Sequence, residues 1–333
     1  MGNESVGAFS VNGLIETIVK RGKNKPFGWR ILDERDIGAD PGDLVVVAGR
    51  TGHGKTTVVF NLLAHWLERY PEETYVIFSY ELPPESIMIR MLSILTRMHG
   101  AVGWSYRDVQ RCLQGGDQRV RPGLKVAELH RAVAELKSWE KRLIVVYQPD
   151  WNVIEVVRHC HEIAPKIPHL GAIFVDYLQL VGPPPGKYES FALEVAHTAR
   201  QFKRLAVRLG CPVVAAAQIR GISIANTGEI PFGTLEDRRV LEFIAKRRPQ
   251  LHHLADAGGE QEADLVLGIL NYQADFFAVR EEAGLEQLSR KETGNAAPFE
   301  VGVIKNRHGA LGTSPLVLEA ASGCIRDPGV FGR

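Results

Sequence analysis

The chain has 333 residues, of which 45% are hydrophobic and 24% charged, and this composition is ordinary for a globular protein. A formal net charge of +1 argues against a protein that coats nucleic acid over its whole surface, but it leaves room for a local basic groove. No apolar run reaches about 18 residues, which disfavours a membrane span, and the N-terminus does not resemble a secretion signal. The 4 cysteines lie far apart without a CxxC spacing, which indicates free thiols. We therefore expect a cytoplasmic protein with no membrane partner.

Residues 11–21 predict a short amphipathic helix, because their apolar side chains recur at the i, i+3, i+4, i+7 and i+8 positions of one face. A polar stretch with glycine and proline follows over 22–28. The apolar face of this helix packs either on its own domain or on a neighbouring subunit. We expect residues 1–27 to form a helical arm with its linker, and 28–333 to form one large domain.

From Asp43 onward, strand-like apolar runs alternate with helical segments, and this pattern predicts an α/β fold with a mostly parallel central sheet flanked by helices. The expected strands are 44–48, 74–79, 143–147, 172–175, 212–217, 265–270, 278–280, 299–304 and a last one near 315–318. The expected helices are 56–68, 84–98, 153–163 and 191–209, with polar helical segments over 101–141. Residues 221–256 are expected to be irregular and charged.

The segment GRTGHGKTT, residues 49–57, satisfies the P-loop pattern in full and lies between a predicted strand and a predicted helix. Its glycines let backbone N–H groups turn toward a β-phosphate, and the helix adds its positive N-terminal end. Lys55 supplies a point charge between the β- and γ-phosphates, and Thr56 supplies a hydroxyl for Mg²⁺. The pattern therefore predicts binding of ATP and Mg²⁺. The predicted nucleotide-binding residues are Gly49, Gly52, His53, Gly54, Lys55, Thr56 and Thr57.

Two carboxylates stand at the ends of predicted strands, where they could complete an ATPase site. Asp176 follows an apolar strand and is expected to hold Mg²⁺ through water, although a strand-end aspartate that caps a turn is the alternative. Glu81 follows the strand after the P-loop helix, and that strand can lie beside the P-loop strand. A carboxylate there could orient and deprotonate the attacking water. Glu85 is the rival for this role, but it lies inside the next helix.

Gln218 ends another predicted strand. An amide at that edge could sense the γ-phosphate through its NH₂ group and signal to the loop beyond it. The alternative is an ordinary surface glutamine at a strand end.

Four segments together resemble the RecA-like motor domain of DnaB-family replicative helicases. They are AGRTGHGKTT (48–57), IFSYELPPESIMIRMLS (77–93), IFVDYLQL (173–180) and VVAAAQ (213–218). The segment KNRHG (305–309) is similar to the Lys-x-Arg-x-Gly segment of the family, so the resemblance spans roughly 28–328. It implies that Glu81 is the catalytic base and that Asp176 is the Walker B carboxylate. It also implies that Gln218 couples the nucleotide to a DNA-binding loop.

The same resemblance implies a homo-hexameric ring around single-stranded DNA. Lys305 and Arg307 would then reach the ATP of the adjacent subunit, with Arg307 as the arginine finger. Charged loop residues would hold the DNA backbone electrostatically, although each could instead be a solvated surface side chain. The predicted DNA-binding residues are Lys187, Arg220, Lys246, Arg247 and Arg248.

The sequence departs from the family in two ways. The large N-terminal helical domain of the family is missing, which suggests a helicase of a phage, plasmid or other mobile element, with a loader or mobile-element protein as a further partner. The segment 254–264 resembles a family segment but lacks its arginine. Two functions therefore stay open: an ATP-driven DNA translocase and helicase, or a nucleotide-dependent DNA-binding clamp or assembly ATPase that does not unwind DNA.

Overall fold

A computed structural model of the chain describes residues 24–115, 122–220, 234–255, 259–282 and 296–328. The predicted helix over 11–21 lies outside these residues, as do residues 221–233 after Gln218 and the last residues of the chain. Within the described part, no helix is both long and apolar enough to cross a membrane.

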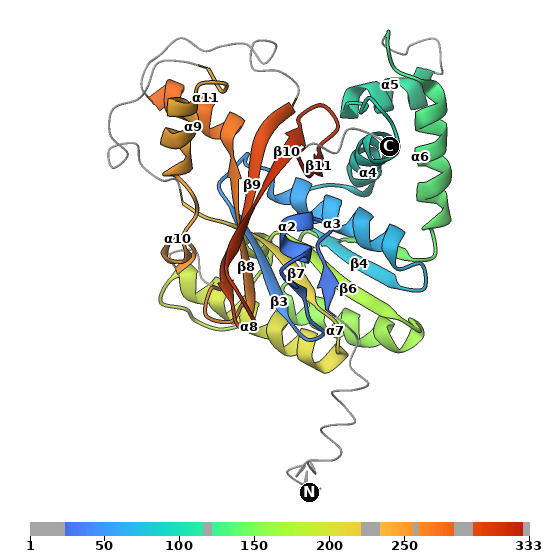
Figure 1. Ribbon diagram of the computed structural model, residues 1–333. Coiled ribbons are helices and arrows are strands. Elements are labelled where there is room, and N and C mark those ends of the chain that lie inside the picture. Colours follow the sequence, from blue (N-terminus) through green and yellow to red (C-terminus); the bar gives the residue numbers. More distant parts are fainter. Residues whose placement is uncertain (1–23, 116–121, 221–233, 256–258, 283–295, 329–333) are drawn as a thin grey trace, which may run out of the picture.

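The described residues contain a nine-stranded sheet in the order β11-β10-β9-β8-β3-β7-β6-β4-β5 (Figure 1). Strands β3 to β8 run parallel to one another, whereas β9 pairs antiparallel with β8, and β10 and β11 continue the sheet in antiparallel fashion. The predicted fold, a mostly parallel sheet flanked by helices, is confirmed. The strands are β3 (Leu44–Gly49), β4 (Thr74–Ser79), β5 (Leu143–Tyr147), β6 (Leu170–Asp176), β7 (Val213–Gln218), β8 (Leu265–Asn271), β9 (Ala296–Asn306), β10 (Gly312–Glu319) and β11 (Cys324–Arg326).

Helices cover both faces of this sheet, and a separate helical cluster stands beside β8 (Figure 1). The larger helices are α3 (Lys55–Arg69), α4 (Pro84–Met98), α5 (Tyr106–Gly115), α6 (Val126–Ser138), α7 (Val153–Ile163), α8 (Phe191–Leu209), α9 (Arg238–Ala245) and α11 (Tyr272–Glu282). The shorter elements are α2 (Arg30–Asp33), α10 (Leu251–Ala255), the 3₁₀ turns η2 (Ala164–Lys166) and η3 (Leu178–Leu180), and the paired strands β1 (Lys25–Pro26) and β2 (Gly38–Ala39).

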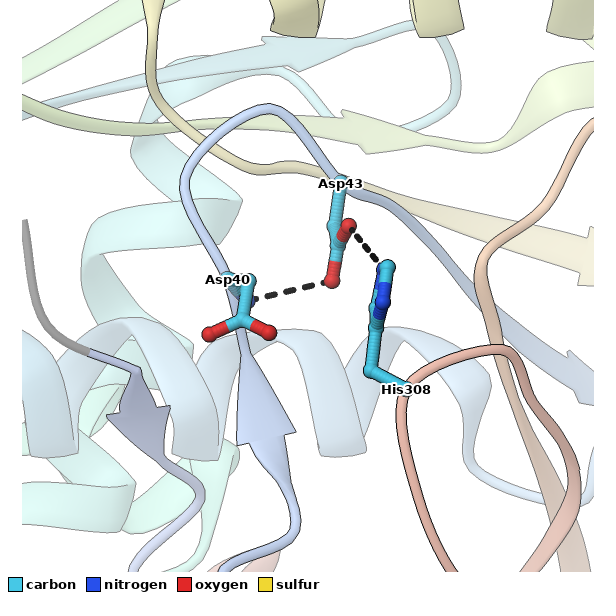
Figure 2. Close-up of side chains that lie close together, drawn as sticks. All are labelled: Asp40, Asp43 and His308. Carbon is cyan, nitrogen blue, oxygen red and sulfur yellow. Dashed lines mark hydrogen bonds and ion pairs between the residues drawn. The ribbon is translucent and has the colours of Figure 1, made fainter. Parts of the chain in front are cut away.

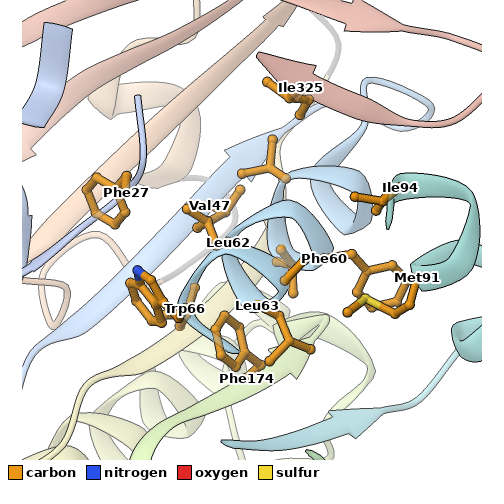
Figure 3. Packing of buried hydrophobic residues seen from close by; sticks show 14 of the residues in the cluster. Phe27, Val47, Phe60, Leu62, Leu63, Trp66, Met91, Ile94, Phe174 and Ile325 are labelled. Carbon is orange, nitrogen blue, oxygen red and sulfur yellow. The ribbon is translucent and has the colours of Figure 1, made fainter. Parts of the chain in front are cut away.

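Helix α3 forms the centre of the larger core, because its apolar side chains are buried against the sheet on one side and α4 on the other (Figure 3). Trp66 is fully buried, its ring centroid lies 5.5 Å from that of Phe174, and its Nε1 donates to the Pro26 carbonyl over 2.7 Å. Truncating such a side chain to alanine typically costs about 3–5 kcal/mol. The packing therefore fixes α3, and with it the P-loop, on the sheet.

Helices α7 and α8 cover the opposite face. Phe202 of α8 is fully buried in the cluster that also holds the alternate side chains of β3 and β7. The central strands are apolar on both faces because both faces are covered, which explains their continuous rather than alternating hydrophobic pattern.

Two expectations about local structure were wrong. Residues 278–280 lie in helix α11 rather than in a strand, and Phe276 and Val279 pack with α9 at helical spacing. A short apolar run does not by itself distinguish a strand from a buried helix. In addition, the part of 221–256 that is described contains α9 and α10.

Strand β4 does not lie beside the P-loop strand as expected, because β7 and β6 stand between them. At the N-terminal end, β1 pairs with β2 and Phe27 is 1% exposed, so the packed body begins a few residues before the boundary at 28. The division into a helical arm and a motor domain otherwise stays a prediction.

Candidate nucleotide-binding site

The P-loop connects β3 to α3 and bends through glycines whose backbone angles favour glycine. Gly52 has a φ of 74° and Gly54, which precedes the first turn of α3, a φ of 95°. A Cβ at Gly49 would stand 3.1 Å from the Cγ of Lys55, so a side chain there would crowd the lysine. The loop thereby presents its backbone and the N-terminus of α3 to a common pocket, as phosphate binding requires.

Lys55 lies at the base of this pocket, and only 9% of its surface is exposed. Its Nζ donates to the Arg50 carbonyl over 3.1 Å. Burial lowers the pKa of Lys55, while the charges of Asp176 and Glu81 oppose that shift. A phosphate group would likewise favour the charged ammonium, so the position suits an anion.

Asp176 ends β6 and is fully buried. The Thr56 hydroxyl donates to its carboxylate, with distances of 3.0 and 2.9 Å to the two oxygens. Burial raises the pKa of Asp176 to about 6, the hydrogen bond from Thr56 opposes the shift, and Glu81 adds to it. A hydroxyl and a carboxylate are oxygen donors of the kind that Mg²⁺ prefers, so this pair fits the metal predicted for it.

Glu81 reaches the same pocket from β4, although that strand is not adjacent to β3. Ser79 of β4 pairs with Asp176 in the sheet, and the Tyr80 N–H donates to the Asp176 carbonyl over 3.0 Å. Glu81 follows directly, is exposed and lines the pocket, whereas Glu85 does not. The arrangement favours Glu81 over Glu85 as the group that faces a nucleotide.

Gln218 ends β7, the immediate neighbour of the P-loop strand, and is paired with Gly49 in the sheet. The Gln179 side chain forms two hydrogen bonds with the backbone of Gln218. It donates to the Gln218 carbonyl over 2.9 Å and accepts from the Gln218 N–H over 3.0 Å. The Gln218 side chain lines the pocket. The amide therefore lies between the nucleotide site and the loop that follows β7.

The pocket itself has a volume of about 300 Å³ and brings together most of the predicted catalytic groups. Its lining residues are Thr51, Gly52, Gly54, Lys55, Thr56, Thr57, Glu81, Leu82, Arg90, Tyr177 and Gln218. Arg90 and Tyr177 were not predicted from the sequence. Arg90 lies near the middle of α4, a mostly apolar helix that starts just after Glu81, and a cation between apolar neighbours is the signal that could have identified it.

His53 was predicted to bind nucleotide, but its side chain is buried and faces away from solvent. Its Nδ1 lies 3.0 Å from the Thr51 carbonyl, and its Nε2 lies 3.4 Å from the carboxylate of Asp275 on α11. A direct contact between the imidazole and a nucleotide is therefore not available in this arrangement.

The parallel strands have a carboxyl edge, where the P-loop lies, and an amino edge, where the strands begin. Lys305 and Arg307 lie at the amino edge, opposite to the P-loop. Strand β9 runs antiparallel to β8 and ends beside its start, where Asn306 pairs with Leu265. Arg307 donates from Nη1 to Asp264 over 3.1 Å and from Nη2 to the Gln261 carbonyl over 2.6 Å. Lys305 donates to the Gln261 carbonyl over 3.3 Å, and burial together with Arg307 lowers its pKa.

His308 fastens the same turn to the start of β3. Figure 2 shows its ring facing Asp43, with Asp40 beside them. The Nε2 of His308 lies 3.2 Å from the Asp43 carboxylate, which also accepts from the Asp40 N–H over 3.1 Å. Burial, and next the charge of Asp264, raises the pKa of Asp43. Two buried carboxylates, Asp43 and Asp264, thus anchor the turn that carries Arg307.

The predicted DNA-binding residues fall into two groups. Lys187, Arg220 and Lys246 are exposed, whereas Arg248 pairs with Glu300 of β9, its Nη2 donating over 2.8 Å. Arg247 is only 2% exposed, and its Nε donates to Asp275 over 2.9 Å. The guanidinium of Arg247 is enclosed by protein, so the DNA contact expected for it is not available to this side chain.

Solved structures with the same fold include a DnaB-like replicative helicase that was described together with its interactions with primase. It matches with a TM-score of 0.69 at 19% identity, covering 96% of this chain and 67% of that one. A solved ATPase domain matches with a TM-score of 0.70 at 19% identity and covers 96% of this chain and 99% of that one. At this level of identity the likeness concerns the fold.

Curated relatives are similar in sequence over most of this chain. The replicative DNA helicase DnaB of Haemophilus influenzae is 29% identical over 248 residues, or 73% of this chain and 45% of that protein. Its counterpart in Buchnera aphidicola subsp. Schizaphis graminum is 28% identical over 291 residues, or 86% of this chain and 51% of that protein. The chain therefore spans about half the length of these relatives.

The sequence model of the family described as "DnaB-like helicase C terminal domain" matches residues 26–323. This match includes the P-loop, both strand-end carboxylates, Gln218 and the turn with Arg307. The chain belongs to the family of DnaB-like helicase C-terminal domains.

Proposed function

We propose that the protein is an ATP-driven, ring-forming translocase on single-stranded DNA that acts as a DNA helicase. The observation that supports this most is the division of one ATPase site between two edges of the sheet. Lys55, Thr56 and Glu81 line a pocket at one edge, and the buried Asp176 accepts a hydrogen bond from Thr56 there. Arg307 lies at the other edge. Such a division suits a ring in which each subunit completes the site of its neighbour.

The pocket groups have complementary roles in this proposal. Lys55 and the loop backbone bind the β- and γ-phosphates, and Thr56 and Asp176 hold Mg²⁺, which supplies positive charge at the phosphates when bound. Glu81 accepts the proton of the attacking water, and as an exposed carboxylate on the pocket wall it is accessible to that water. Arg90 adds a second cation on this wall.

Distance argues that Arg307 acts in trans. Its turn lies beside the starts of β8 and β3, and the P-loop follows the end of β3. Because a strand rises about 3.3 Å per residue, the two ends of β3 lie roughly 16 Å apart, farther than an arginine side chain extends. Arg307 would therefore stabilise charge on the γ-phosphate of an adjacent subunit.

DNA would bind to the exposed cations of the loops at the pocket edge of the sheet. Lys187 and Arg220 follow β6 and β7, the strands that carry Asp176 and Gln218. Gln218 would transmit the state of the γ-phosphate to the loop that begins at Arg220. Contacts of this kind are electrostatic, so affinity should fall steeply with salt.

ATP hydrolysis at low salt, measured with and without single-stranded DNA, tests the proposal. DNA should stimulate hydrolysis, and forked duplexes should be opened in the presence of ATP. Absence of any DNA-stimulated hydrolysis would contradict it. Stimulated hydrolysis without strand displacement would instead favour the nucleotide-dependent clamp or assembly ATPase. A mobile-element origin, and a loader or mobile-element partner, stay predictions from the sequence.

A further inference from the structure

A buried ionic cluster joins the P-loop to α11, the helix that follows β8. Asp275 of α11 is 0% exposed, and its two carboxylate oxygens contact different parts of the chain. One oxygen pairs with the guanidinium of Arg50 and lies 3.4 Å from His53. The other accepts from Arg247 over 2.9 Å. All four side chains are at least nine-tenths buried.

Two of these partners belong to the P-loop itself. Arg50 and His53 occupy positions inside the Gly49–Gly54 segment, and the Arg50 carbonyl accepts from Lys55 over 3.1 Å. A shift of Arg50 would therefore move the hydrogen-bond partner of the phosphate-binding lysine. Arg50 therefore links Asp275 to Lys55, the side chain that is proposed to bind the phosphates of ATP.

The third partner belongs to the segment that follows Gln218. Arg247 comes just after α9, between the predicted DNA-binding residues Lys246 and Arg248. Helices α9 and α11 also pack together through apolar side chains, including Phe243 and Phe276. The cluster thus joins the nucleotide loop to the segment on which DNA contacts were predicted.

We propose that Asp275 is a positioning residue of the nucleotide site, which fixes the P-loop through Arg50 and His53 and ties it to the DNA-side segment through Arg247. Arg247 then acts on nucleotide affinity and not as a phosphate contact for DNA. This inference rests on the proposed function of the P-loop as an ATP site.

Electrostatics explains why the carboxylate of Asp275 can affect nucleotide binding. Removing one member of a buried ion pair is strongly destabilising, because the charge of the other member is then less well compensated. Without Asp275, both arginines would lose the ion pair that each makes with it. Since Arg50 is part of the loop, a portion of that cost appears as weaker phosphate binding.

The test uses three variants and two equilibrium measurements. Asp275→Asn keeps the side-chain volume but removes the charge, and Arg247→Met removes the guanidinium. Arg238→Met is the matched control, because Arg238 is an exposed arginine of α9 that pairs only at the surface with Glu242. For each protein, one measures the Kd for a fluorescent, slowly hydrolysed ATP analogue and the salt dependence of single-stranded DNA binding.

We expect Asp275→Asn and Arg247→Met to raise the nucleotide Kd about tenfold or more, since even a third of the cost of an uncompensated charge corresponds to such a factor. The slope of DNA affinity against salt should stay unchanged in both. Arg238→Met should leave the nucleotide Kd unchanged. If a single variant does not fold, the double variant Asp275→Asn/Arg247→Gln replaces the charges by amides, and it should show the same rise in Kd.

Two results would overturn the inference. One is a nucleotide Kd within about twofold of the parent in both variants that fold. The other is an Arg247→Met protein whose salt slope falls by about one while its nucleotide Kd is unchanged, because that result marks a phosphate contact. Neither measurement needs hydrolysis. A parent protein that binds no ATP analogue would contradict the proposed function itself, so the two failures are distinguishable.

Discussion

The two edges of the sheet carry different halves of the proposed ATPase chemistry. At the carboxyl edge of β3, β7 and β6, the side chains of Lys55 and Thr56 line one pocket, and the buried Asp176 accepts a hydrogen bond from Thr56. At the opposite edge, Arg307 and His308 are held by the buried carboxylates Asp264 and Asp43. The first edge carries the groups proposed to bind a nucleotide, whereas the second presents the partly exposed cation of Arg307 to solvent.

This difference suggests that nucleotide binding and ATP hydrolysis depend on different parts of the chain. In the proposed function, the P-loop and Lys55 bind ATP without help from another chain. Arg307 is held far from that pocket, so under the same proposal it acts only when a second copy brings a pocket to it. Binding and hydrolysis should therefore be separable by mutation, and each prediction below sharpens or breaks that separation.

The largest effect on ATP hydrolysis is expected from replacing Lys55 at one edge or Arg307 at the other. Lys55→Ala should abolish hydrolysis and also weaken nucleotide binding, because the lysine contacts the phosphates directly. Arg307→Ala should lower kcat by about a thousandfold or more and leave the Kd of an ATP analogue nearly unchanged. Steady-state hydrolysis and analogue titration measure the two quantities. A large rise in Kd for Arg307→Ala would mean that both edges serve the same nucleotide of one chain.

The next effect concerns the proton on Asp176. Its pKa is raised from 3.8 to about 6 by burial, so the charged form is destabilised by folding. That cost is fully present above about pH 6 and disappears as the pH falls toward 4. Asp176→Asn should therefore raise the free energy of unfolding at pH 8 by on the order of 2 kcal/mol, and have little effect at pH 4.

Chemical denaturation at the two pH values measures this difference. Protonation should also compete with Mg²⁺, so Mg²⁺-dependent nucleotide binding should weaken below about pH 6. The Asp176→Asn protein should have lost that pH dependence along with most of its Mg²⁺ response. An equal change in stability at both pH values would show that the carboxyl group is not the one that titrates.

A smaller effect is expected at the DNA surface. Lys187→Ala should reduce the slope of log affinity against log salt by about one, because one phosphate contact is lost. Lys141→Ala is the matched control, since Lys141 is an exposed lysine near the start of β5, at the opposite edge. Binding of a fluorescent oligonucleotide across a salt series measures both. Equal slopes for the two variants would remove Lys187 from the DNA path.

The smallest effect is expected at the turn that carries the arginine. The side chain of His308 is 51% exposed, and such ion pairs contribute under about 1 kcal/mol. His308→Ala should therefore change the unfolding free energy little, because Asp264 still holds Arg307. Chemical denaturation measures this change. A loss of several kcal/mol in the free energy of unfolding would show that the contact between His308 and Asp43 in Figure 2 is important for stability.

Most of the residues that line the pocket could be named from the sequence, because they lie at or just after strand ends. The P-loop pattern identifies Lys55 and Thr56 directly, and parallel strands with polar residues at their carboxyl ends point to Asp176 and Gln218. The position of β4 could not be predicted from the order of elements alone, since β6 and β7 are inserted between it and β3. Glu81 reaches the pocket nonetheless, because the pairing of β4 with β6 brings it beside Asp176.

The ionic contacts were much less predictable. In the sequence, Arg247 resembles its exposed neighbours Lys246 and Arg248. Only the fold reveals that its side chain is buried and donates to Asp275. Asp275 lies in a segment partly expected to be a strand, which hid its helical position next to the P-loop. Long-range pairs of this kind leave no local pattern, because each partner by itself is an ordinary charged residue.

Mixing two inactive variants tests the central claim, that the site is completed by a second chain. One protein carries Arg307→Ala and keeps Glu81, and the other carries Glu81→Gln and keeps Arg307. At mixed interfaces an intact Glu81 pocket meets an intact Arg307, so co-assembled protein should recover part of the ATP hydrolysis. A mixture that co-assembles and stays inactive at every ratio would contradict the account.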